Sequence, residues 1–383
     1  MTFRFIHTAD WQIGKRFGAF DDETAARLRA ARISVIERIA DTARAKGAAH
    51  ILVAGDIFDR ENAEPSVYRQ PIAKLKAYKD LTWHLLPGNH DAVRGRIWGP
   101  IIKDGLPENI RLYVEPGMHE IADGVELLVS PLMSRTATDD PTIWMDGAET
   151  SGQHLRIGLA HGSVTDFGGQ ASVLIDADRA KKAKLDYLAL GDWHGLKEIN
   201  SCTYYSGTPE PDSWMQNDPG HVLAVSLDGQ GNAPQIERIK IGQYVWHERE
   251  IEVTSDFDIN RITDGLDELS SEPDHLLLKI RLKGVITPEA YGELDQTINR
   301  LAAICGALRR NEKRLEIRLL ASDLESLKSD PTLHLTATRL KAMVEAATDD
   351  DKAAGEAALK RLFTYSARLD DDRPDVPLDG GPS

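Results

Sequence analysis

The sequence predicts an α/β fold in which two β-sheets pack together and helices connect the strands. Between residues 1 and 253, short apolar runs alternate with segments of helical periodicity, a pattern typical of buried strands in α/β units. Five of the apolar runs end at polar side chains suited to bind a metal or a phosphate. Strand ends and the loops after them carry ligand and catalytic groups in such sheets, so we expect these side chains to converge on one rim.

Each of the five strand-like runs leads into a short motif. The runs are FRFIHTA, HILVA, LTWHLL, LRIGLA and LDYLAL, and the motifs at their ends are HTADWQ (7–12), GDIFD (55–59), GNHD (88–91), AHG (160–162) and GDWH (191–194). Glycines within these motifs let the backbone pass close to a metal or phosphate, where a side chain would obstruct it. One such motif alone fits an ordinary loop, but five in this order favour a functional site.

Helices are predicted over residues 22–46 and 65–79, between the first three strands, with Asp21 or Asp22 as the cap of the first. Residues 111–130 have the pattern of short alternating strands. A polar insertion then predicts a long loop with a short helix. Four further strands predict a second, mostly antiparallel sheet, near residues 203–206, 221–227, 235–240 and 243–252.

The composition changes near Thr254, which predicts a domain boundary there. A small α/β unit is expected from two helix-like and two strand-like segments, at residues 259–269, 288–304, 275–284 and 314–320. Residues 322–366 have the periodicity of amphipathic helices, and the end from Asp370 has no core-forming pattern and is expected to be disordered. The predicted domains are residues 1–253, 254–321 and 322–383.

Composition limits the classes of protein that fit. The chain has 383 residues, 41% of them hydrophobic, which is ample for a buried core and more than one domain. Two cysteines and the lack of a leader or long apolar run predict a cytoplasmic protein without a membrane segment. The net charge of −15 argues against broad adhesion to nucleic acid. It is compatible with a nuclease whose partner supplies a cationic track.

The motifs together supply a mixed oxygen and nitrogen ligand set, large enough to hold two divalent cations. The candidate residues are Asp10, Gln12, Asp56, Asn89, His90, His161, Asp192 and His194. Two cations on a bridging carboxylate lower the pKa of a shared water and clamp phosphate oxygens during in-line displacement. The residues therefore predict metal-dependent phosphoester hydrolysis, without a covalent nucleophile.

These motifs resemble those of the calcineurin-like metallophosphoesterases, whose pattern is D-x-H, GD, GNHD or GNHE, H and G-H-x-H. HTADWQIG, GDIFD, YLALGDWHG and the following YSGTPEP (205–211) are most similar to segments of the SbcD type of DNA repair nuclease. The resemblance covers roughly residues 1–250. It implies an αββα metallophosphoesterase sandwich, with a small α/β cap domain and a helical C-terminal tail.

The resemblance also implies roles for single residues. Asp10, Gln12 and His194 correspond to ligands of the first metal, and Asn89, His161 and Asp192 to ligands of the second, with Asp56 bridging both. His90 stays off the metals and faces the substrate phosphate, and Asp91 fixes its loop. Asp59 is expected to contact or orient His90, although a turn or capping carboxylate is an equal alternative.

Two positions depart from the family pattern. Gln12 and Asp192 stand where the family has histidines. A neutral amide is a poor replacement for imidazole and a carboxylate a strong one, so the first metal is expected to bind weakly and the second to have harder ligands. This exchange favours Mn²⁺, with Mg²⁺ or Fe²⁺ as alternatives, over Zn²⁺.

The sequence is thus interpreted as a two-metal phosphodiesterase acting on DNA, as an SbcD-like exonuclease or endonuclease in DNA repair. The resemblance implies a coiled-coil ATPase partner of the SbcC type, bound by the tail at residues 322–366, and allows a homodimer. Folding of that tail back onto the cap is an equal alternative. Two other functions stay open: a phosphoesterase for small phosphoesters or phosphoproteins, and a weakly catalytic subunit of an ATPase complex.

Overall fold

The computed structural model describes residues 2–62, 64–150, 152, 154–164, 173–254, 259–318, 324, 327–346, 352 and 354–363. Contacts divide the chain into two compact units, Met1–Tyr244 and Val245–Ser383, and each is described by itself. The division precedes the strand at Val245–Val253, which the sequence placed inside the first domain. The predicted end of the tail, from Asp370, lies outside the described residues.

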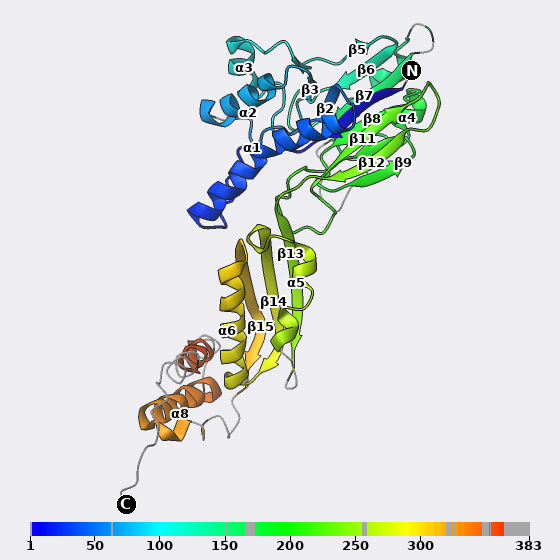
Figure 1. The fold of residues 1–383 in the computed structure, drawn as a ribbon. Helices are drawn as coiled ribbons and strands as arrows, with labels where there is room; N and C mark the ends of the chain where they lie inside the picture. The colour runs from blue at the N-terminus through cyan, green and yellow to red at the C-terminus, as the bar shows by residue number, and fades with distance from the viewer. Residues whose placement is uncertain are drawn as a thin grey trace, which may run out of the picture. The chain divides into compact units, whose positions relative to one another are not determined.

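The first sheet carries the first three motifs (Figure 1). Its strands run in the order β12-β11-β1-β2-β3-β4, and β1 to β4 are parallel. In chain order the bounds are β1 Phe3–Thr8, β2 His50–Ala54, β3 Thr82–Leu86, β4 Ile110–Leu112, β11 His221–Leu227 and β12 Gln235–Lys240. One face of this sheet is covered by helices α1 (Asp22–Ala45), α2 (Pro65–Ala77) and α3 (Trp98–Asp104).

Helix α1 shows why this segment folds as it does. It begins after Asp21, whose carboxylate accepts a hydrogen bond from the Thr24 amide at 2.9 Å and so caps the helix. Val35, Ile36 and Ile39 recur at helical spacing and are buried against the sheet. The helix and its cap, both expected from the sequence, are confirmed.

The second sheet carries the last two motifs. Its strands run in the order β5-β6-β7-β8-β10-β9, with bounds β5 Gly117–Ala122, β6 Val125–Ser130, β7 Leu155–His161, β8 Tyr187–Gly191, β9 Lys197–Asn200 and β10 Thr203–Tyr205. Leu127 and Leu159 of this sheet pack between the sheets against Phe5 and Leu52 of the first. The short helices η1 (Ile143–Gly147) and α4 (Arg179–Lys182) cover its other face. The first unit is therefore an αββα sandwich, as predicted.

The strands after the last motif pair differently from the prediction of a separate antiparallel sheet. β11 and β12 extend the first sheet beside β1, and β10 joins the second sheet beside β8. The last strand of that prediction, β13 (Val245–Val253), belongs to the second unit. The alternating pattern of these four segments identified them as strands. Which strands they pair with depends on contacts between segments that are distant along the chain, so the pattern could not predict it.

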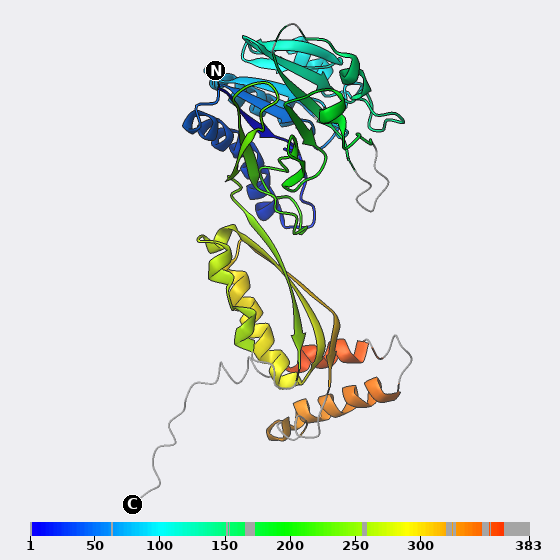
Figure 2. The same ribbon diagram turned by 90° about the vertical axis from the view of Figure 1, so that its right-hand side faces the viewer.

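The second unit contains a three-stranded parallel sheet in the order β13-β14-β15, with β14 at Leu276–Ile286 and β15 at Ala307–Ile317. Helix α6 (Pro288–Ile304) crosses between these two strands and packs along one face of the sheet (Figure 2). The shorter elements are η2 (Ile259–Ile262), α5 (Leu266–Leu269) and η3 (Pro273–His275). The expected small α/β unit is present, and its last strand begins earlier than the sequence predicted.

The C-terminal helices pack on one another within the second unit. They comprise η4 (Leu327–Ser329), α8 (Pro331–Ala346) and a helix over residues 354–363. Ala337 of α8 is fully buried against Leu359 and Phe363. Lys360 approaches Glu312 of β15 at 3.8 Å. The apolar faces are thus partly covered within the chain, and binding of an ATPase by this tail stays a prediction.

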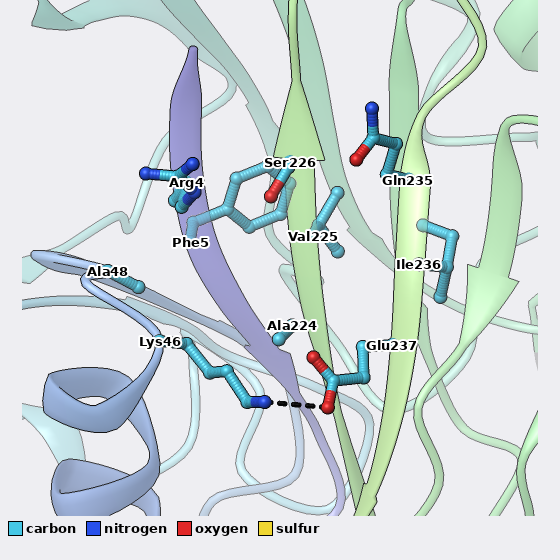
Figure 3. A pocket seen from close by; sticks show the side chains of 10 residues that line it. All are labelled: Arg4, Phe5, Lys46, Ala48, Ala224, Val225, Ser226, Gln235, Ile236 and Glu237. Atoms are coloured by element: carbon cyan, nitrogen blue, oxygen red, sulfur yellow. Dashed lines mark hydrogen bonds and ion pairs between the residues drawn. The ribbon is translucent and has the colours of Figure 1, made fainter.

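A surface pocket of about 310 Å³ lies on β1, β11 and β12 (Figure 3). Lys46, just after α1, closes one side through an ion pair with Glu237 at 2.6 Å. Arg4 and Phe5 line the start of β1, whereas the motif residues follow the opposite end of that strand. The pocket therefore does not belong to the predicted site. In the described part of the chain, no helix has the length and apolar character needed to cross a bilayer.

We predict that buried His84 makes the fold sensitive to acid. Its ring contacts His50 at 3.0 Å and the Tyr113 hydroxyl at 2.8 Å, and burial, with smaller effects of His50 and Arg111, lowers its pKa from 6.5 to about 3. The unfolded chain takes up a proton below pH 6.5 that folded His84 excludes. Stability is therefore lost as pH falls through that value, by up to about 1.4 kcal/mol per pH unit.

Chemical denaturation of wild type and His84→Gln from pH 7.5 to 5 measures this effect. The glutamine can hydrogen bond but does not titrate, so its free energy of unfolding should fall less steeply with acid. Parallel curves for the two proteins would contradict the prediction.

Candidate metal centre

The structure brings the predicted ligands together where strands of both sheets end. Asp10, Asp56 and Asn89 follow β1, β2 and β3 of the first sheet, and His161 ends β7 of the second. Asp192 and His194 follow β8. Asp10, Asp56 and His194 each place one ligand atom within 4.8 Å of the others.

A second group of ligand atoms lies beside the first. His161 Nε2 is 3.5 Å from Asp56 Oδ1 and 3.8 Å from Asp192 Oδ1. Asn89 Nδ2 donates to the same Asp192 oxygen at 3.3 Å. Asp56 thus adjoins both groups, which is the position that a bridging carboxylate needs.

Three motif glycines allow the two sheets to approach each other closely at the site, because they have no side chain. A Cβ at Gly191 would lie 1.9 Å from the Ala54 carbonyl oxygen, and one at Gly55 would lie 2.2 Å from His161 Nδ1. A Cβ at Gly88 would lie 2.3 Å from Asp56 Oδ1. Any side chain at these positions would displace the backbone or a ligand residue, so glycine permits the close packing seen here. The expected approach of this backbone to a metal or phosphate stays a prediction.

Four site residues have backbone conformations that L-residues rarely adopt. The φ angles are 54° at Asp10, 49° at Gln12, 53° at Asp56 and 108° at Asp192. The first two residues are held there because the Asp10 amide donates to the Gly55 carbonyl and the Gln12 amide to the Asp56 carbonyl, both at 3.0 Å. Clustering of such residues is characteristic of functional sites.

His161 tests whether the residues fit a metal. Its Nδ1 donates to the Ala54 carbonyl at 2.8 Å, which leaves Nε2 to bind either a proton or a metal. That Nε2 is buried and forms no hydrogen bond with any residue that the structure describes. A divalent cation that replaces the proton there would be coordinated by the ring nitrogen and by the two neighbouring carboxylates, so the residues fit.

Electrostatics also favour cations here. Burial raises the pKa of Asp10 to about 7, and nearby His194 and His161 act in the opposite direction. Burial disfavours the charged forms of His161 and His194 as well, but neighbouring carboxylates, Asp56 for the first and Asp212 for the second, raise the pKa of each ring to about 9. The cluster therefore has an excess of buried negative charge, which bound protons or metal ions can neutralise.

His90 and Asp91 occupy different environments in the GNHD loop. The His90 amide donates to Asp56 Oδ1 at 2.8 Å, and its ring Nδ1 donates to the Asp59 carbonyl at 3.1 Å. Asp91 is fully buried and accepts hydrogen bonds from the Gly88 and Phe58 amides at 2.6 and 3.1 Å. Burial raises the pKa of Asp91 to about 7. These bonds let Asp91 tie its own loop to the loop after β2.

Asp59 contacts His90 through its main chain. Its carbonyl holds the ring, whereas its carboxylate pairs with Arg60 at 3.2 Å. Any residue at position 59 could offer that carbonyl, so a role of the Asp59 carboxylate at His90 stays a prediction.

The two departures from the family pattern also lie in the site. Gln12 Nε2 donates to Asp56 Oδ2 at 2.7 Å, so its amide nitrogen faces the carboxylate between the two groups. Asp192 accepts a hydrogen bond from Ser163 at 2.7 Å and lies on the side of Asn89 and His161. Sequence reasoning did not identify Ser163, or Asp212, which contacts His194 Nδ1 at 3.2 Å.

Two clusters of candidate ligand atoms joined by one carboxylate are the arrangement that two-metal phosphoesterases use. Residues 3–226 match the model of the calcineurin-like phosphoesterases. This is more than half of the 383 residues, and the chain belongs to that family of metal-dependent phosphoesterases, which use divalent ions. A search of curated proteins finds no match.

A search of solved structures also finds matches to part of the chain. Protein TT1561 of Thermus thermophilus is 12% identical, with a TM-score of 0.41, over 63% of this chain and 99% of that chain. A dimetal phosphatase from Danio rerio is also 12% identical, with a TM-score of 0.37, over 61% of this chain and 98% of that chain. At these scores neither structure adds to the family assignment.

We predict that Gln12→His raises the affinity of the Asp10 and His194 group for metal and shifts its preference toward Zn²⁺. An imidazole would replace an amide whose nitrogen now donates to Asp56. Isothermal titration with Mn²⁺ and Zn²⁺ measures the change, with Gln235→His on the distant strand β12 as the control. Identical curves for wild type and Gln12→His would show that position 12 does not contact a metal.

Proposed function

We propose that this chain is a two-metal phosphodiesterase that cleaves DNA, in the manner of the SbcD type of nuclease. The observation that carries the metal-dependent part is the buried Nε2 of His161, which lies beside Asp56 and Asp192 and has no hydrogen bond with any described residue. The choice of DNA rests on the resemblance of HTADWQIG, GDIFD and YLALGDWHG to the motifs of those nucleases. Mn²⁺ is the metal we expect, because carboxylate and amide oxygens replace imidazoles in the set.

The proposed chemistry assigns separate tasks to the residues. Asp10, Asp56 and His194 would hold one divalent ion, and Asn89, His161 and Asp192 with Asp56 the other. When bound, such ions activate a water and neutralise charge on the phosphate. Asp56 also accepts the His90 amide, so the loop that carries His90 is tied to the ligand set.

His90 would act on the leaving oxygen. Its Nδ1 proton is donated to the Asp59 carbonyl at 3.1 Å, which orients the ring and leaves Nε2 for the substrate. A protonated ring can donate from Nε2 to the oxygen on which negative charge develops as the P–O bond breaks. Asp91 keeps the loop in place through the Gly88 and Phe58 amides.

Arginines near the site support a polyanionic substrate despite the net charge of −15. Arg16 and Arg60 line a depression of about 210 Å³ between the loops that follow β1 and β2. Arg94 and Arg96 are exposed on the loop after GNHD. Exposed guanidinium groups around a phosphodiesterase site can contact the phosphates on either side of the cleaved bond.

A phosphoesterase for small phosphoesters or phosphoproteins is the second candidate, and the overall acidity favours it. Mn²⁺ titrations of activity on linear duplex DNA, single-stranded DNA and nitrophenyl phosphate separate the two, together with elemental analysis. Faster turnover of DNA supports the proposal. Turnover of the monoester alone contradicts it, and absence of bound metal contradicts both candidates.

We predict that His90→Asn retains metal but lowers phosphodiester hydrolysis by at least ~100-fold, the scale for loss of a general acid or charge stabiliser. Metal content by elemental analysis and rates on a DNA strand are measured together. His154→Asn, a change at a half-buried histidine that pairs with Glu126, is the control and should leave both unchanged. Loss of one metal equivalent in His90→Asn would instead make His90 a ligand.

A further inference from the structure

A charged side chain is buried on the apolar face of helix α1. Arg32 is 1% exposed and lies at helical spacing from Leu28, Val35 and Ile36. Fully buried arginines are rare unless other groups pair with them, because desolvation of a charge is costly. The groups that contact the Arg32 guanidinium therefore indicate its structural role.

The Arg32 guanidinium contacts two segments that lie far apart along the chain. Nη1 donates to the Trp11 carbonyl, between the site residues Asp10 and Gln12. Nη2 donates to the Glu210 carbonyl at 3.0 Å and lies 3.5 Å from Asp212 Oδ2. One planar group thus connects the loop after β1 with residues 210–212.

Asp212 joins this guanidinium to a candidate metal ligand. Its side chain is 1% exposed and receives His194 Nδ1 at 3.2 Å and Lys15 Nζ at 2.5 Å. Because Nδ1 of His194 donates to the carboxylate, Nε2 is the atom left for a metal. Asp212 therefore determines both the tautomer and the orientation of that ring.

Further contacts keep this group of residues rigid. Arg38, a second residue of α1, pairs with Glu210 Oε2 at 2.5 Å. The Gln243 and Tyr244 amides donate to the same carboxylate, each at 2.9 Å. Glu210 is 2% exposed, so its carbonyl gives Arg32 a fixed acceptor.

We propose that Arg32 and Asp212 form a positioning pair that aligns the two halves of the first metal site. Arg32 holds the loop of Asp10 and Gln12, which comes from the first sheet, and Asp212 holds His194, which comes from the second. Neither residue is a ligand or a catalytic residue. The inference rests on the proposed metal centre and is independent of the identity of the substrate.

An ordinary structural ion pair is the alternative. Buried ion pairs contribute little net stability compared with apolar side chains of similar size, so stability alone is a weak explanation for this one. The chain also contains a buried arginine and a buried aspartate away from the site: Asp186 accepts the main-chain amide of Arg156 at 2.8 Å, and the Arg156 guanidinium donates to the Ala183 carbonyl at 3.0 Å. Substitutions of these two residues serve as controls for the loss of buried packing.

The test measures Mn²⁺ binding to the full chain by calorimetry and by electron paramagnetic resonance. Asp212→Asn retains an acceptor for His194 but loses the charge that Lys15 and Arg32 contact, and Arg32→Lys loses the fork that reaches Trp11 and Asp212. We expect each change to weaken one of two Mn²⁺ sites by about 10 to 100-fold, the usual effect of removing a group that orients a ligand. The other site should keep its affinity.

Co²⁺-substituted protein supplies a second readout, because absorption of the bound ion reports ligand geometry. Its spectrum should change in Asp212→Asn and Arg32→Lys but not in the controls Asp186→Asn and Arg156→Lys. If Asp212→Asn does not fold, Lys15→Met, which removes the partially exposed partner, should weaken the same site by a smaller factor.

Two outcomes overturn this inference: wild-type Mn²⁺ affinity at both sites in Asp212→Asn and Arg32→Lys, or equal weakening by the control substitutions. Where Asp212→Asn does not fold, unchanged binding in both Arg32→Lys and Lys15→Met has the same meaning. Failure of the wild-type chain to bind Mn²⁺ is a different result, because it contradicts the proposed function itself.

Discussion

The candidate site depends on the close approach of two strand ends, one from each sheet. The Ala54 carbonyl at the end of β2 lies so near Gly191 at the end of β8 that no side chain fits between them. The same carbonyl accepts the Nδ1 proton of His161. Apolar residues packed between the sheets, among them Leu52 and Leu159, hold the two sheets together and so bring these strand ends close to each other. Hydrophobic packing in the sandwich thus sets the separation of polar groups at its rim.

That packing also creates an electrostatic problem, because it places Asp10, Asp56 and Asp192 within one small region. Ordinary buried carboxylates find cationic side chains, as Asp212 does with Lys15 and Arg32. The three site carboxylates instead have histidine rings as their nearest basic neighbours. Burial removes water from all of these carboxylates, and the lost hydration must be compensated. Asp212 is compensated by cationic side chains of the protein itself, whereas the site carboxylates can be compensated by a metal ion that binds from solution.

Much of this arrangement could be predicted from the chain because local patterns determine it. Apolar runs identified the five strands before the motifs, and the placement of Asp10, Asp56 and His194 at strand ends followed from that. In contrast, no local sequence pattern indicates that β11 pairs with β1, or on which side of it. Arg32 could have been noticed, since it interrupts the apolar stripe formed by Leu28, Val35 and Ile36. Its partner Asp212 could not, because the contact spans 180 residues of sequence.

The positive φ angles at Asp10, Gln12, Asp56 and Asp192 have a consequence for how this protein can change over time. Each such conformation costs an L-residue about 1 to 3 kcal/mol, and glycine would relieve part of that cost. Random substitution followed by selection for thermal stability alone would therefore favour loss of these side chains. Stability and metal binding oppose each other at these positions, so variants of this fold that have lost activity should be more robust than active ones.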